Sequence, residues 1–72
     1  MSGRPVKHSL TLKGHRTSVS LEAEFWESFQ RLARGRGISV NELAAEVDAG
    51  RDGDVGLASA IRVWVLRALT AR

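Results

Sequence analysis

The sequence predicts a small, mainly helical fold that carries one short β-ribbon, and three observations support this class. Polar and apolar residues alternate from Arg16 to Leu21, which is the period of a strand. The apolar residues that follow recur at helical spacing, and a serine-based helix start at Ser39–Glu42 opens a second helical stretch. With only 72 residues in the chain, these elements must share a single small domain.

The predicted strand has two faces of different character. Its more apolar face carries Thr17, Val19 and Leu21, and its polar face carries Arg16, Ser18 and Ser20. A single strand cannot satisfy its own backbone hydrogen bonds, so this strand must pair with another. Two partners are open at this point: residues 8–12, which precede a Lys13–Gly14 turn, or a second copy of the chain.

Three helices are expected after the strand. The first follows Glu22 and ends at the glycines of residues 35–37, and the second begins with the Ser39–Glu42 capping box. The third is apolar on more than one face, so we expect a second subunit to cover one of these faces. The chain then divides into a basic N-terminal arm at 1–15 (with a short strand at 8–12 if those residues pair), a core at 16–49, a loop at 50–56 and a C-terminal helix at 57–72.

Positive charge is concentrated at the start of the chain. The net charge is +3, from 11 Lys and Arg against 8 Asp and Glu. Residues 1–20 contain Arg4, Lys7, Lys13 and Arg16 but no acidic residue. A block of this kind attracts the phosphate backbone of a nucleic acid.

The absence of cysteine narrows the classes of protein that the chain can represent. Without cysteine there is no disulfide and no thiolate zinc site to stabilise a small core. Short chains without such staples often oligomerise, so we expect a dimer or a higher oligomer.

The sequence has no apolar run long enough for a membrane helix and no signal-peptide pattern, so we expect cytoplasmic residence and no membrane partner.

No residue pattern indicates catalysis, a cofactor or a metal. His8 and His15 have neither a cysteine nor a nearby acid, and Asp48, Asp52 and Asp54 do not have the spacing of a calcium loop. No arrangement of Ser, His and Asp or of paired carboxylates is supported beyond composition. We therefore expect a protein that is not an enzyme.

Over residues 16–49 the chain resembles the Arc-type ribbon-helix-helix DNA-binding family. The resemblance rests on the strand Arg16–Leu21, the helix Glu22–Arg36 and the element Gly37-Ile38-Ser39-Val40-Asn41-Glu42-Leu43. In that family two chains intertwine, and their strands pair into an antiparallel ribbon that enters the DNA major groove. The resemblance therefore implies an intertwined homodimer with an added C-terminal helix.

The resemblance also implies roles for individual residues. Arg16, Ser18 and Ser20 would face the bases, and the amides of Val40 and Asn41 would hold a phosphate. Lys7 and Lys13 are candidates for further backbone contacts, with a solvated basic tail as the alternative. The expected dimer core comprises Thr17, Val19, Leu21, Phe25, Trp26, Phe29, Leu43, Val47, Ile61 and Trp64.

The leading functional hypothesis is a homodimeric transcription regulator, a repressor that binds a short inverted-repeat operator in double-stranded DNA without a cofactor. A protein-interaction module, such as an antitoxin or a small assembly adaptor, is the alternative. A third hypothesis keeps the dimer but gives it an architectural role on DNA, without sequence choice.

Overall fold

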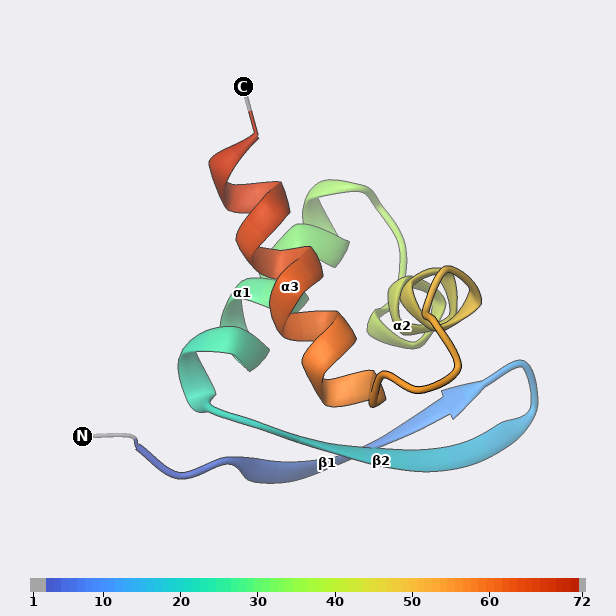
Figure 1. The fold of residues 1–72 in the computed structure, drawn as a ribbon. Coiled ribbons are helices and arrows are strands. Elements are labelled where there is room, and N and C mark those ends of the chain that lie inside the picture. The colour runs from blue at the N-terminus through green and yellow to red at the C-terminus, as the bar shows by residue number, and fades with distance from the viewer. Residues whose placement is uncertain (1–2, 72) are drawn as a thin grey trace.

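In the computed structural model, which describes residues 3–71, a two-stranded β-hairpin is followed by three helices (Figure 1). The elements are β1 (Val6–Leu12), β2 (His15–Leu21), α1 (Ala23–Gly35), α2 (Val40–Ala49) and α3 (Leu57–Thr70). The hairpin forms one layer, and the helices pack on one of its sides. This architecture confirms the predicted mainly helical class with a short β-ribbon.

The hairpin pairs two strands of the same chain. β1 and β2 are antiparallel, with Val6 opposite Leu21 and Leu12 opposite His15. Of the two partners that the sequence left open for β2, the structure therefore shows the preceding segment. Lys13 and Gly14 link the strands with φ values of 52° and 85°, the left-handed conformation of the tight turns that match strand twist.

The end of α1 sets the direction of the chain into α2. Gly37 has a φ of 69°, and its amide donates to the carbonyl of Arg34 at 3.0 Å. The amide of Ile38 donates to the carbonyl of Ala33 at 3.1 Å. This pair of bonds is a Schellman motif, in which a glycine satisfies the last carbonyls of a helix.

The predicted capping box at the start of α2 is confirmed. The Glu42 amide donates to Ser39 Oγ at 3.0 Å, and the Ser39 amide donates to Glu42 Oε1 at 2.9 Å. These hydrogen bonds hold the pKa of the Glu42 carboxyl below its ordinary value, with the bond from the Ser39 amide as the largest cause. The start of α2 is therefore fixed by local chemistry alone.

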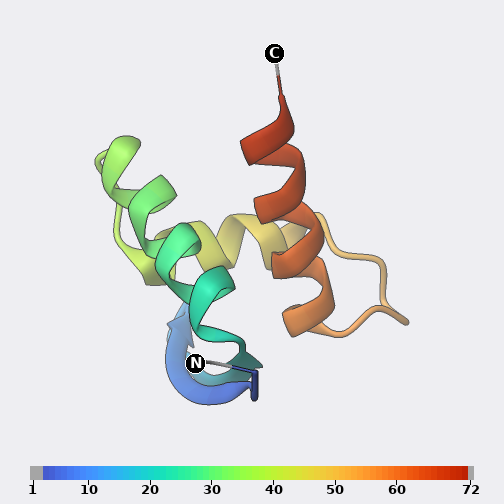
Figure 2. The ribbon, with the colours of Figure 1, turned by 90° about the vertical axis from the view of Figure 1, so that its left-hand side faces the viewer.

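The core lies between the inner face of the hairpin and the three helices. Its buried residues are Leu10, Val19, Leu21, Phe29, Ala33, Leu43, Ala44, Val47, Ile61 and Val65. Phe29 is at the centre: its ring meets the edge of Trp64 at a centroid distance of 5.9 Å. Figure 2 shows that α1 and α3 diverge toward their C-terminal ends, while α2 runs across between them.

An ion pair ties α3 to the junction between β2 and α1. Arg62 Nε donates to Glu22 Oε1 at 2.9 Å, and its Nη2 donates to the backbone carbonyl of Ser20 at 3.3 Å. The hydrogen bond from Arg62 is the largest cause that lowers the pKa of Glu22 below its ordinary value of 4.5. The added helix is thus attached to the hairpin by charge as well as by apolar packing.

This ion pair predicts a specific loss of stability in acid. A carboxyl whose pKa is lowered by folding stabilises the fold above its ordinary pKa of 4.5, and this contribution disappears as the pH falls through the folded-state value. We expect the free energy of unfolding, measured by urea denaturation, to fall less between pH 6 and pH 3 in Glu22→Gln than in the wild type. The matched control is Glu27→Gln, an exposed position on α1, which should keep the wild-type pH dependence. Equal acid sensitivity in Glu22→Gln and the wild type would contradict this prediction.

Candidate nucleic-acid interface

The outer face of the hairpin is entirely polar. Residues directly opposite one another in the strand pair lie on the same side of the sheet, and the outer face is made by the pairs Lys7–Ser20, Ser9–Ser18 and Thr11–Arg16. All of these side chains are exposed. The other side of the same hairpin buries Leu10, Val19 and Leu21 in the core. The hairpin therefore has a polar solvent face and an inner face that packs on the helices through these three residues.

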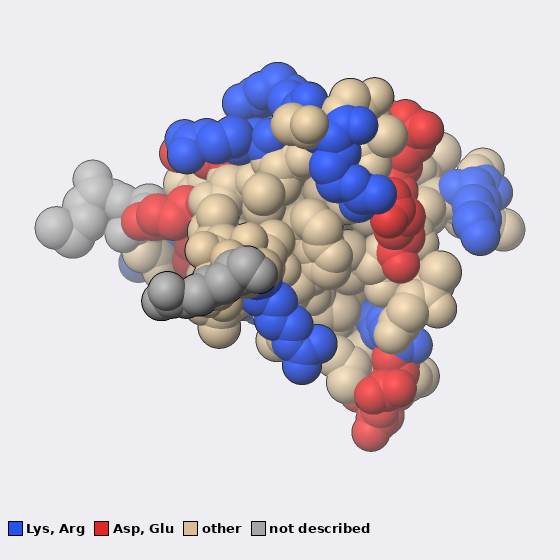
Figure 3. All heavy atoms as spheres, turned by 90° about the horizontal axis from the view of Figure 1, so that it is seen from above, with Lys and Arg blue, Asp and Glu red and all other residues tan. Residues whose placement is uncertain are grey.

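The positive charge of the N-terminal block is concentrated on and around this outer face. Lys7 and Arg16 lie on it, Lys13 lies at the turn, and Arg4 precedes β1; all are exposed. Within residues 3–71, none of these cations forms an ion pair. The opposite, helical side of the molecule displays Lys and Arg together with Asp and Glu (Figure 3). The hairpin thus provides the acid-free surface that a phosphate backbone favours.

α2 occupies one position on the outer edge of β1. The Thr11 amide donates to Asn41 Oδ1 at 3.0 Å, so this N–H points away from β2. In an antiparallel pair, residues whose backbone groups point outward alternate with residues that bond across the pair. Arg16, opposite Thr11, and Ser18, two residues further along, must therefore also point their backbone groups outward, at the free edge of β2.

The outer edge of β2 is open over two residues. The Ser20 carbonyl accepts a hydrogen bond from Arg62, which covers the far end of this edge. The backbone N–H and C=O groups of Arg16 and Ser18 have no hydrogen-bond partner within the described residues. Unpaired groups of this kind are a template for another strand.

The N-terminus of α2 lies at the rim of the outer face. Asn41 contacts Thr11 of β1, which brings the first turn of α2 beside the hairpin. The amide of Glu42 is used by the Ser39 cap, whereas the amides of Val40 and Asn41 have no hydrogen-bond partner in the described part of the chain. Free amides at a helix N-terminus favour an anion.

The residues predicted for the dimer core mostly pack within the single chain. Val19, Leu21, Phe29, Leu43, Val47 and Ile61 are buried, whereas Phe25, Trp26 and Trp64 are half-buried. Thr17 shares the inner side of the sheet but is exposed. It lies next to the open edge of β2, where a further strand would meet it.

Sequence reasoning missed several residues of this region. Ser9 and Thr11 complete the outer face, and their alternation with Leu10 and Leu12 was the available signal. The Asn41 side chain covers a strand edge, which no local pattern indicates. His8 stacks on Trp26, with ring centroids 3.9 Å apart and an angle of 6° between the rings.

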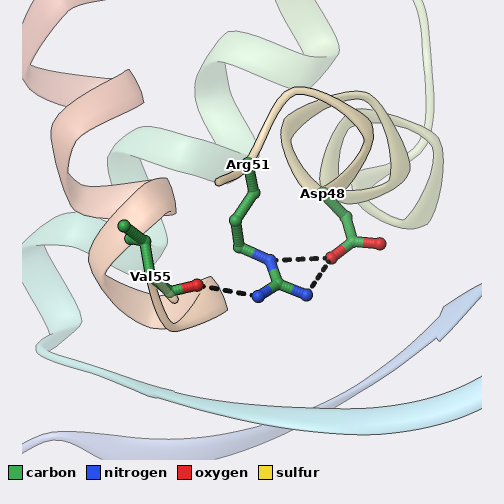
Figure 4. A network of polar contacts seen from close by, with 3 residues as sticks. All are labelled: Asp48, Arg51 and Val55. Carbon is green, nitrogen blue, oxygen red and sulfur yellow. Dashed lines mark hydrogen bonds and ion pairs between the residues drawn. The ribbon is translucent and has the colours of Figure 1, made fainter. Parts of the chain in front are cut away.

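The loop between α2 and α3 is held in shape by one arginine. Arg51 Nε and Nη2 donate to Asp48 Oδ1 at 3.0 and 2.8 Å, and Nη1 donates to the carbonyl of Val55 at 2.7 Å (Figure 4).

Among the described residues, no group of three His, Asp or Glu side chains could hold a metal ion. None of the helices within residues 3–71 is long and apolar enough to cross a membrane.

Comparison with known protein families gives a match over most of the chain. A family model described as a ribbon-helix-helix domain matches residues 5–69, nearly the whole chain. This match includes β1 and nearly all of α3, which lie outside the stretch that carried the sequence resemblance. No curated protein and no solved structure matches the chain.

Proposed function

The chain belongs to the ribbon-helix-helix family, and on this premise we propose that it is a homodimeric transcription regulator that represses by binding a short inverted repeat in double-stranded DNA. Domains of this family bind DNA and typically dimerise, and the class is not enzymatic. The observation that carries the proposal is the polar, acid-free outer face of the hairpin. A bound dimer acts sterically, by excluding polymerase from the operator, and needs no cofactor.

The dimer forms by pairing of β2 with β2 of a second copy. The backbone groups of Arg16 and Ser18 are the ones available on this edge, and an antiparallel register that sets Arg16 of each copy opposite Ser18 of the other uses all of them. In this register Thr17 faces its symmetry mate across the two-fold axis. Its exposure in the single chain supports the arrangement.

The central strand pair of this dimer enters the major groove. Strands lie about 4.8 Å apart, so two of them fit a groove about 12 Å wide. Arg16 makes a bidentate contact to guanine, and the Ser18 and Ser20 hydroxyls contact base edges. Lys7 on the outer strand and Lys13 at the turn reach the phosphates that border the groove.

A second backbone contact comes from α2. The amides of Val40 and Asn41 bind a phosphate beside the groove, supported by their position at the rim of the outer face. This contact orients the dimer on the duplex and carries no sequence information of its own.

Selection of bound duplexes from a random pool at near-physiological salt tests the proposed function. We expect enrichment of one short inverted repeat, with an affinity that falls steeply as salt is raised. Equal retention of random and enriched duplexes would favour an architectural role. Recovery of one stoichiometric protein partner and no DNA would favour a protein-interaction module. Either of these two results would contradict the proposal of a transcription regulator.

Arg16→Ala is expected to weaken binding to the selected operator by about 1–3 kcal/mol and to relax the base preference at one position in each half-site. The measurement is a titration of selected and single-base-substituted duplexes. Arg34→Ala is the matched control, because it removes the same charge from an exposed position on α1. An equal loss in both variants, with base preference unchanged, would show that Arg16 contributes charge only.

A further inference from the structure

The outer surface of α3 is apolar although it faces away from the core. Val63 is 45% exposed and Leu66 is 59% exposed, and Val55 in the preceding loop is 36% exposed. Neighbouring residues on the other side of the helix, Ile61 and Val65, are fully buried. Contiguous exposed apolar patches on a protein surface mark interaction sites.

A groove of about 380 Å³ runs along this surface. It is lined by Glu46, Val47, Gly50, Arg51, Asp52, Val55, Ala60, Val63, Trp64 and Arg67. Figure 2 shows the loop on the side of α3 that faces away from α1. Because Arg51 binds both Asp48 and the Val55 carbonyl, the loop wall of the groove is already ordered.

The sizes of the side chains along α3 fit a second copy of the same helix. Val63 lies at the middle of Leu57–Thr70. Small residues, Ser59 and Ala60, precede it on the outer surface, and large residues, Leu66 and Arg67, follow it. In an antiparallel pair centred on Val63, Leu66 of each copy lies opposite Ser59 of the other, and Arg67 lies opposite Ala60, because these residues share a flank of the helix. Large side chains then meet small ones throughout.

The charges around the groove fit the same arrangement. Asp52 and Asp54 lie in the loop just before α3, and Arg67 lies near its other end. None of them forms an ion pair within the described part of the chain. Antiparallel pairing brings the Arg67 guanidinium of one copy toward the loop carboxylates of the other, twice by symmetry.

We propose that α3 is a second self-association surface, on which α3 of another copy packs antiparallel about a two-fold axis at Val63. Such a contact is isologous, since the same patch serves both copies. It uses none of the residues of the β2 edge and needs no DNA. Together, the two contacts connect dimers to one another through their C-terminal helices.

Cysteine cross-linking tests the proposal, because the natural chain has no cysteine. In Val63→Cys the two sulfurs face each other across the axis, within reach of a disulfide. In Leu69→Cys the same residue of the two copies lies about 18 Å apart along the helix axes. Leu69 is more exposed than Val63, at 60% against 45%, so random collision would favour the control position.

Under mild oxidation of the DNA-free protein, we expect Val63→Cys to form covalent pairs at least 10-fold faster than Leu69→Cys. Circular dichroism of both variants establishes that the fold is kept. Equal rates at the two positions, faster linkage at position 69, or no linkage at either position would each overturn the proposal.

Discussion

Phe29→Ala is expected to remove about 3–5 kcal/mol from the free energy of unfolding. Phe29 is fully buried, and its ring lies 5.9 Å from that of Trp64 and 6.4 Å from that of Trp26. Its removal leaves a cavity where α1 meets α3, and the neighbouring rings can fill it only partly. A chain of 72 residues has a total free energy of unfolding of only about 4–11 kcal/mol. The variant should therefore lose a large part of its total stability.

Urea denaturation followed by tryptophan fluorescence measures this loss, since both aromatic neighbours of Phe29 are tryptophans. Phe25→Ala is the matched control: it is the other phenylalanine of the chain, and it is only half-buried. We expect the control to lose clearly less stability. If the two variants lost the same amount, the core would not be centred on Phe29.

Ser18→Pro is expected to disrupt the proposed dimer while leaving the hairpin intact. The Ser18 amide points outward from β2, so proline removes no hydrogen bond within the chain. It removes two symmetry-related bonds from the β2 pair, worth together about 2 kcal/mol. The dissociation constant of the dimer should rise about 30-fold, and more if the proline ring also prevents close approach. Sedimentation equilibrium measures this change.

Ser9→Pro is the control for that prediction. Ser9 lies directly opposite Ser18 on β1, so the variant loses the same hydroxyl from the outer face and points its proline to the other edge of the hairpin. We expect it to keep the wild-type dissociation constant and the wild-type dichroism. Weakened association in both variants alike would argue against pairing through β2.

Local patterns predicted most of the fold because their causes are local. The two faces of β2 follow from alternation, and the start of α2 follows from hydrogen bonds between Ser39 and Glu42. The partner of β2 could not be predicted in this way, since alternation identifies the buried side of a strand but not its neighbour. The length of β1 was also underestimated: His8 does not count as apolar, and it is half-buried through its stack on Trp26.

The candidate site divides in the same manner. Arg16, Ser18 and Ser20 lie on one exposed side, as their spacing indicated. The neighbouring Ser9 and Thr11, and the contact of Asn41 with β1, depend on which segments meet in space. Periodicity along one strand cannot supply this information, because the contacts join residues as far apart as Thr11 and Asn41.

The side chains that bond to the two edges of the hairpin have a consequence for the addition of further strands. At the β1 edge, the Thr11 amide donates to the Asn41 side chain. At the β2 edge, the Arg62 guanidinium donates to the Ser20 carbonyl. A hairpin whose two edges both carry only unpaired backbone groups could add strands without limit, as amyloid does. Here each edge has one occupied position, so an added strand can use only the neighbouring residues, Arg16 and Ser18 on β2 or Lys7 and Ser9 on β1. A strand added at either edge can therefore pair over only a short stretch, which disfavours the long, uninterrupted ladder that a fibril needs.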